Sequence, residues 1–248
     1  MLKGGYWALA LAGLTVLAGC AHSPVTDPDD PIEGFNRGVY SFNTTVDDYV
    51  LRPVTKGYTK ITPAVAQTGV SNFFSNLTYP TVIVNDALQG KIVQHFSDVA
   101  RFLFNSIVGI GGLVDAASMI GLEKHDEDFG QTLGYWGLGN GAFLMLPILG
   151  PSSNRDLVGR IGDAGTSVTT YVGLEVSAPL TVMGAIDTRA QLLSTDNVIQ
   201  QQLDPYIFIR NAYLQRRESL VYDGTPPKEE RAPKDSDRSK RKHRSKQI

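Results

Sequence analysis

Two long segments of this chain contain no charged side chain. They are residues 61–85 and 129–154, which span 25 and 26 residues. Helices that face water interleave charged residues with apolar ones, so such segments lie in a protein core or against lipid. The second segment also holds six glycines and two prolines, Pro147 and Pro151. These residues interrupt the hydrogen-bond ladder of a helix, which excludes a straight transmembrane helix. Two interpretations remain: a re-entrant or hairpin segment that dips into a bilayer from one side, or a helical hairpin buried in a soluble protein.

The rest of the body has helical periodicity. Apolar residues recur at intervals of three and four within residues 35–49, and a broader apolar stripe occurs within residues 92–107;. Asp204 followed by Pro205 suits the N-cap and first turn of a last helix. Residues 81–84 are the only strand-like run, and a lone strand has no partner to pair with;. We therefore expect a mainly α fold.

The N-terminus has the composition of a bacterial lipoprotein signal. A short cationic start precedes an apolar run at residues 6–17, which is too short for a transmembrane helix;. Small residues then lead to Cys20, the only cysteine of the chain. We predict a signal peptide at residues 1–19, acylation of Cys20 and a polar, lipidated tether at residues 20–30. The alternative is an ordinary secreted protein with a coincidental cysteine.

The residue after Cys20 is Ala21. An aspartate at that place usually retains a lipoprotein in the inner membrane of bacteria with two membranes, so its absence favours the outer membrane. An acylated cysteine would hold the body at a bilayer surface. For this reason we favour membrane contact over a buried hairpin for the charge-free segments.

The charge of the chain is unevenly distributed. Residues 223–248 carry nine Lys and Arg against five Asp and Glu, whereas the whole chain has a net charge of −2. The body is therefore acidic, which argues against nucleic-acid binding. The segment 223–248 lacks apolar periodicity and contains repeated prolines, so we predict a disordered basic tail. It either favours an anionic lipid surface or simply keeps the protein solvated.

The sequence lacks the residue sets that common active sites require. There is no nucleophile elbow, no phosphate-binding loop and no histidine spacing typical of zinc sites;. His95 is expected to be exposed on the polar edge of a helix. His125 is expected to lie in a solvated loop or at an acidic helix start within residues 123–128. We therefore expect no catalytic residue, no metal ligand and no cofactor.

Several short motifs occur along the chain in the order of one known family, over roughly residues 28–220. The first motif contains Asp30, Pro31, Glu33, Phe35, Asn36, Arg37, Tyr40, Phe42 and Asn43. The others are Arg52-Pro53, 69–77, 101–106, 109–115, 128–134, 188–193 and Asp204-Pro205-Tyr206 with Arg210, Ala212-Tyr213 and Arg216. With these motifs the chain resembles the MlaA (VacJ) family of outer-membrane phospholipid-transport lipoproteins. It departs from the family in two places: the turn at residues 137–143 lacks a Pro-Tyr pair, and the basic tail has no counterpart.

The resemblance implies a fold and a function. It implies that residues 31–222 form a single, mainly α domain, a helical ring or wedge that lies in the inner leaflet of the outer membrane around an amphipathic channel. It implies the removal of mislocalised phospholipids from the outer leaflet, which keeps the lipid asymmetry. The implied partners are phospholipids, a trimeric porin and a periplasmic lipid-carrier protein (MlaC-like), with no nucleic acid. The implied place is the periplasmic side of the outer membrane.

We expect three groups of residues to matter for this function. We expect the first helix to be held in place by Asn36, Arg37, Tyr40 and Asn43 more than we expect these residues to touch lipid. A stripe on the last helix either guides phosphate heads or consists of core tyrosines and structural ion pairs, and we favour the latter; it comprises Tyr206, Arg210, Tyr213 and Arg217. The residues expected to contact the membrane, most of them in the hairpin, are Phe73, Phe74, Gly139, Gly141, Phe143, Leu144, Leu146 and Pro147.

Two other functions compete with lipid transport. The chain could be a structural or adaptor lipoprotein that scaffolds porins and moves no lipid. A lipid hydrolase is a more distant alternative, because no nucleophile elbow is present. Lipid that co-purifies with the protein, or phospholipid that accumulates at the cell surface on deletion, would separate transport from scaffolding. Release of free fatty acid from labelled phospholipid would identify a hydrolase.

Overall fold

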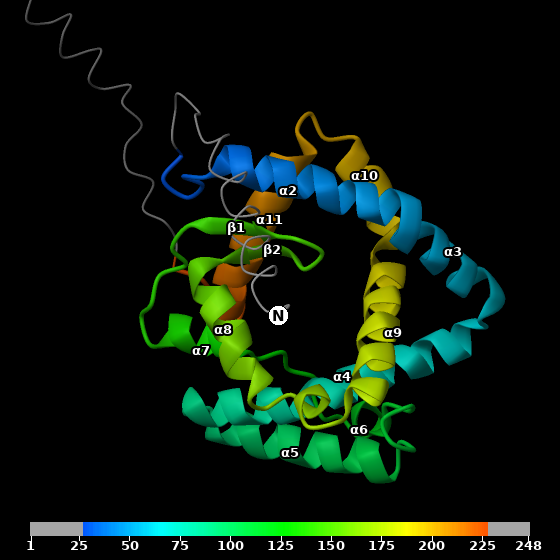
Figure 1. Cartoon of the computed structure of the whole chain (residues 1–248). Helices are drawn as coiled ribbons and strands as arrows, with labels where there is room; N and C mark the ends of the chain where they lie inside the picture. Colours follow the sequence, from blue (N-terminus) through cyan, green and yellow to red (C-terminus); the bar gives the residue numbers. More distant parts are fainter. Residues whose placement is uncertain (1–26, 228–248) are drawn as a thin grey trace, which may run out of the picture.

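The computed structural model describes residues 27–227, whose helices are arranged as a ring (Figure 1). Helices α2 and α3 form one side, α9 the next, α4 and α5 the base, and α7, α8 and α11 the remaining side with a small strand hairpin. In chain order the helices are α2 (Glu33–Val46), the π-helical turn η2 (Asp47–Leu51), α3 (Arg52–Ile61), α4 (Ala64–Leu88), α5 (Ile92–Ile107), α6 (Ala116–Met119), α7 (Phe129–Tyr135), α8 (Asn154–Ala164), η3 (Val168–Thr170), α9 (Leu174–Leu192), η4 (Leu193–Thr195), α10 (Asp196–Gln200) and α11 (Pro205–Val221). The predicted mainly α ring is confirmed.

Side-chain caps set the beginnings of four of these helices, and in α6 the cap is Asp115, which accepts from the amide of Ser118. Asp128 accepts a hydrogen bond from the amide of Gln131 at 2.8 Å at the start of α7. Ser153 caps α8 in the same way. At the start of α11, Asp204 accepts from the amide of Ile207 at 3.1 Å and Pro205 follows as the first helical residue, as its fixed φ favours;. The predicted beginning of the last helix is therefore confirmed.

The strands lie elsewhere than the sequence suggested. Residues 81–84 belong to α4, where packing against α5 outweighs the β propensity of their branched side chains;. The antiparallel pair is β1 (Phe143–Leu146) with β2 (Gly150–Ser153), in a register that places Phe143 opposite Ser153. The second charge-free segment thus forms a strand hairpin after α7. The alternative of a buried helical hairpin was wrong.

The apolar core is small and lies where α2, the hairpin and α11 meet. Its buried members are Val39, Phe143, Met145 and Tyr206. Phe143 is fully buried, and its ring contacts the ring of Tyr206 at 6.1 Å between centroids. The expectation that Phe143 contacts the membrane was therefore wrong. In β1 the side chains alternate, and that of Phe143 points to the core face;.

Polar residues occupy much of the interior, while large apolar residues lie on the surface. In α5 the side chains of Asp98, Arg101 and Asn105 are buried, but Val93 is 86 % exposed and Phe96 is 65 % exposed. A water-soluble helix has the opposite orientation. We call Ile92, Val93, Phe96, Leu103 and Ile107 the α5 apolar face; further exposed apolar side chains include Ile110, Met119, Ile120, Ile148 and Leu149.

Both histidines of the described chain are less exposed than expected. His95 is half-buried, with Nδ1 at 2.9 Å from the carbonyl oxygen of Ile83. His125 is also half-buried, with Nδ1 at 2.9 Å from the carboxylate of Asp98. Their surroundings are polar because α5 turns its polar face inward. Within residues 27–227 no group of acidic, histidine or cysteine side chains is arranged to hold a metal ion.

The folded body begins before residue 31. Asp30 is buried and accepts hydrogen bonds from Tyr206 and Asn36, and Asp27 forms an ion pair with Arg210 at 2.8 Å. Residues 27–30 are thus part of the body and not of a free tether. Three predictions fall outside the described residues: the signal peptide at residues 1–19, the acylation of Cys20, and residues 228–248 of the tail predicted at 223–248. Over residues 27–227, no helix combines the length and the apolar character needed to cross a membrane.

Candidate functional site

A cavity of about 600 Å³ opens between α2, η2, the hairpin, α9, α10 and α11. One wall carries all the charge: Asp47, Asp48, Arg52, Arg189 and Asp196. Apolar side chains form much of the remainder, and they include Tyr40, Met145, Leu192, Ile199 and Ile209. A molecule with a charged end and an apolar end would match both walls.

The charged wall is a connected network of ion pairs. Arg189 binds both oxygens of Asp47, at 2.7 and 2.8 Å, and its Nη2 lies 2.9 Å from an oxygen of Asp196. Arg52 binds Asp196 at 2.7 Å and Asp48 at 2.9 Å. Burial would raise the pKa of Asp196, but the hydrogen bonds from the two arginines lower it;. Asp196 therefore carries its charge inside the cavity and joins the two guanidinium groups.

Asn43 connects α2 to the turn of the hairpin at the edge of this cavity. Its amide nitrogen donates to the carbonyl of Leu146 at 2.9 Å, and its oxygen accepts from the amide of Ile148 at 2.7 Å. Ile148 has a φ of 66°, a left-handed conformation that branched residues rarely adopt;. The Asn43 side chain therefore supports a strained turn, as expected for a residue that holds the structure.

We predict that Asn43→Ala frees the hairpin turn. The two lost hydrogen bonds should lower its local stability by about 1–2 kcal/mol. Hydrogen exchange of the Ile148 amide should speed up by about tenfold or more, which corresponds to about 1.4 kcal/mol. The matched control is Thr44→Ala, because Thr44 donates only to the carbonyl of Tyr40 within α2. Unchanged exchange at Ile148 in the Asn43 variant would show that the turn is held by other contacts.

The first-helix motif forms the junction of the ring. Asn36 is buried, donates to Asp30 at 2.7 Å and to the carbonyl of Phe143 at 3.0 Å, and accepts from the amide of Met145 at 2.9 Å. Arg37 binds Asp204 at 2.6 Å. These contacts join α2 to β1 and α11. The other motif residues differ in exposure: Glu33, Phe35 and Tyr40 are half-buried, whereas Pro31 and Phe42 are exposed.

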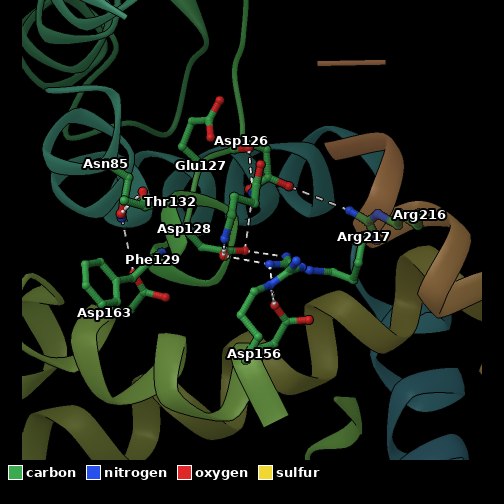
Figure 2. Close-up of polar contacts among 12 residues, drawn as sticks. Asn85, Asp126, Glu127, Asp128, Phe129, Thr132, Asp156, Asp163, Arg216 and Arg217 are labelled. Atoms are coloured by element: carbon green, nitrogen blue, oxygen red, sulfur yellow. Dashed lines mark hydrogen bonds and ion pairs between the residues drawn. The ribbon is translucent and has the colours of Figure 1, made fainter. Parts of the chain in front are cut away.

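The stripe on α11 points into the protein. Arg217 lies between Asp128 and Asp156, with nitrogen–oxygen distances of 2.5 Å to Asp128 and 2.9 Å to Asp156 (Figure 2). Tyr213 donates to Asp156 at 2.5 Å. Burial would raise the pKa of Asp128, but its hydrogen bonds and charge interaction with Arg217 lower it. This geometry favours the ion-pair interpretation that we preferred.

The two N-terminal residues of the same stripe, Tyr206 and Arg210, also make structural contacts. Arg210 is buried and faces Asp27 and Asp30. Tyr206 is buried and donates its hydroxyl hydrogen to Asp30. Neither side chain lines the large cavity. We therefore do not place phosphate-head guidance at Tyr206, Arg210, Tyr213 and Arg217.

The residues expected to contact the membrane fall into several environments. Phe73 and Phe74 of α4 are half-buried and pack edge to face at 5.4 Å between ring centroids. Gly141 has a φ of 65°, which suits the sharp entry into β1;. The remainder of the set is Gly139 and Pro147, which are exposed, and Leu144 and Leu146, which are half-buried. Close to the expected contact site, Ile148 and Leu149 carry the exposed apolar surface of the turn.

A second buried polar cluster lies between α4, α5 and the segment before α7. Asp86 is fully buried and accepts from Gln94 at 2.7 Å, while its Oδ2 has no hydrogen-bond partner among the described residues. Burial, the adjacent carboxyl of Asp98 and the charge of Glu127 raise the pKa of Asp86 to about 8;. Asp86 therefore keeps a proton in the folded state that it loses in the unfolded state at neutral pH.

This difference predicts how stability depends on pH. Because the folded pKa of Asp86 is the higher one, its contribution is present below about pH 4 and is lost as the pH rises towards about 8. Asp86→Asn keeps the shape without the acid. It should raise the free energy of unfolding near pH 8 by at least about 1 kcal/mol and flatten the pH profile. This lower bound is modest, because one unit of pKa shift already corresponds to about 1.4 kcal/mol. Denaturant titrations at several pH values test this; a wild-type slope in the variant would contradict it.

None of the five charged cavity residues was singled out as a candidate site residue in the sequence. Asp48 and Arg52 are four residues apart, a spacing that places both on one helical face and could have identified the pair;. Arg189 and Asp47 are 142 positions apart, so no local pattern links them. Arg52 and Arg189 occur within motifs that we noted, but without an assigned role. Of the candidate residues, Tyr40 and Asn43 do line the cavity.

Known proteins are similar to this chain in both sequence and fold. The chain matches the family model of the MlaA lipoprotein over residues 28–220. It is 41 % identical to the intermembrane phospholipid transport system lipoprotein MlaA of Shigella flexneri and 40 % identical to that of Escherichia coli (strain K12), with 88 % of both chains covered in each case. A solved structure described as the structural basis for maintenance of bacterial outer membrane lipid asymmetry has a TM-score of 0.71 at 39 % identity, and the match covers 77 % of this chain and 98 % of that one. The chain therefore belongs to the MlaA lipoprotein family.

Proposed function

We propose that this protein removes mislocalised phospholipids from the outer leaflet of the outer membrane through the cavity between α2, η2, the hairpin, α9, α10 and α11. The observation that carries the proposal is the pairing of a charged wall with an apolar wall around one opening of about 600 Å³. A phospholipid has the same two parts. A head group that passes along the charged wall avoids the cost of entering hydrocarbon without partners.

We propose further that the ring lies partly in the inner leaflet. The α5 apolar face and the exposed Ile148 and Leu149 of the hairpin turn support this placement. Apolar surface of this extent is unfavourable in water and favourable in hydrocarbon. The buried polar residues of α5 then lie on the side away from lipid. The predicted acyl groups on Cys20 would keep the body at the membrane.

A trimeric porin and a periplasmic lipid carrier complete the proposal. The porin would hold the ring beside its own wall, and the carrier would receive lipid on the periplasmic side. The relatives are named as components of an intermembrane phospholipid transport system, which supports the existence of a receiving partner. Affinity purification of the tagged, membrane-extracted protein should recover a porin, and its absence would remove that part of the proposal.

The central test measures phospholipid at the cell surface. A strain without the gene should accumulate phospholipid in the outer leaflet, and the wild-type gene should reverse this. A scaffolding lipoprotein would leave surface phospholipid unchanged while altering porin assembly. In a second arm, the purified protein is incubated with labelled phospholipid; release of free fatty acid would identify a hydrolase instead.

A further inference from the structure

The charged wall of the cavity has an excess of negative charge. It contains three aspartates and two arginines, and every guanidinium group already binds carboxylates of the same wall. A phosphate that binds either arginine therefore competes with an aspartate for the guanidinium charge. The wall therefore differs from a site that simply attracts anions, which would present unpaired cationic groups.

The pairs of this network differ in exposure. Arg189 with Asp47, and Arg52 with Asp196, have side chains that are mostly buried. The pair of Asp48 and Arg52 is the most open, because the Asp48 side chain is 46 % exposed. Among the described residues, Oδ2 of Asp48 accepts no hydrogen bond; only Oδ1 is bound, by Arg52 at 2.9 Å. Partly exposed pairs of this kind are held weakly and exchange easily.

Resting on the function proposed above, we propose that the cavity selects phospholipids with a zwitterionic head group, and that Asp48 and Arg52 are the specificity-determining pair. The ammonium of the head group binds Asp48, and its phosphate takes the place of Asp48 on Arg52. One ion pair is exchanged for two, so no charge is left unpaired. Asp196 continues to hold Arg52 in place during the exchange.

An anionic head group has no ammonium that could bind Asp48. Its phosphate would separate Arg52 from Asp48 and leave the Asp48 carboxylate without a cation, next to another negative charge. Asp47 and Asp196 on the same wall add to the repulsion. The site therefore discriminates against anionic head groups through the unpaired carboxylate of Asp48, and not only through a favourable contact with zwitterionic ones.

The test uses the full-length protein in detergent with an equimolar mixture of dioleoyl phosphatidylethanolamine, phosphatidylcholine and phosphatidylglycerol. Native mass spectrometry measures the lipids that remain bound. The wild type should retain the two zwitterionic lipids over phosphatidylglycerol. Asp48→Asn should reduce that ratio by about two- to fivefold, the range typical of a partly exposed ion pair, and Asp48→Lys should favour phosphatidylglycerol.

The matched control is Asp126→Asn, because Asp126 is also exposed, at 67 %, and pairs with Arg216 away from the cavity. This control should keep the wild-type ratio, and thermal unfolding should confirm that all variants are folded. A wild type that retains the three lipids equally, or an Asp48→Asn variant with an unchanged ratio, would overturn the proposed selectivity while leaving lipid binding intact. A wild type that retains no lipid would instead contradict the proposed function.

Discussion

Replacement of Arg217 by alanine is expected to lower the free energy of unfolding by about 3 kcal/mol, the lower end for a broken buried ion pair, because it removes the cation of Asp128 and one of the two cations that bind Asp156;. Arg217 is the only basic side chain that binds both Asp128 and Asp156 among the described residues (Figure 2). Asp156 is buried, so water cannot replace the lost partner, and the carboxylate keeps Arg155 at 3.2 Å as its remaining cation;. The variant should accumulate poorly in cells, and denaturant titration in detergent should measure the loss directly.

The neighbouring residue supplies the matched control for this prediction. Arg216 is 72 % exposed and lies 3.6 Å from Asp126, also at the surface. Arg216→Ala removes the same charge from the same helix and should change stability by no more than about 1 kcal/mol. A stable, folded Arg217→Ala variant that fails to clear surface phospholipid would contradict the structural role of Arg217. It would indicate instead that Arg217 guides phospholipid head groups.

Two aspartates on the α5 apolar face should abolish lipid clearance without unfolding the protein. Val93 and Phe96 are largely exposed, so Val93→Asp with Phe96→Asp removes few contacts, and stability in detergent should change by no more than about 1 kcal/mol;. In the membrane, each aspartate near the centre of a bilayer is unfavourable by about 2.5–3.5 kcal/mol. The ring should then sit too shallow in the leaflet, and phospholipid should accumulate at the cell surface.

The control for this variant keeps the face apolar. Val93→Ala with Phe96→Leu changes the same two positions and should clear surface phospholipid as the wild type does. Both variants are compared in a strain that lacks the chromosomal gene, at equal protein levels. If the double aspartate variant clears phospholipid normally, the α5 apolar face does not lie in hydrocarbon, and another surface must face the membrane.

Local patterns in the sequence predicted much of the helical structure. The apolar spacing of residues 92–107 corresponds to α5, and the Asp204-Pro205 pair begins α11. These features depend on residues within a few positions of one another, where backbone geometry links sequence directly to structure. The strand-like residues 81–84 were misassigned because their branched side chains favour strands, while contacts with α5 hold them in a helix.

Local patterns could not predict which face of a helix or strand points into the protein. An amphipathic helix shows two faces in its sequence, but the side that points inward depends on the solvent around the molecule. In α5 the polar face is the buried one. Likewise, the charge-free segment 129–154 indicated a hairpin but not that Phe143 would face the core beside Tyr206.

By itself, the sequence determined that this chain is a mainly α member of the MlaA lipoprotein family. It did so through helical periodicity, capping residues and short motifs, all of which act over short distances along the chain. Only the tertiary structure decided where the cavity lies and which charges line it. Arg189 meets Asp47, and Arg52 meets Asp196, across more than 140 positions. Ion pairs form between residues that the whole ring brings together, and closing that ring is a property of all its helices at once.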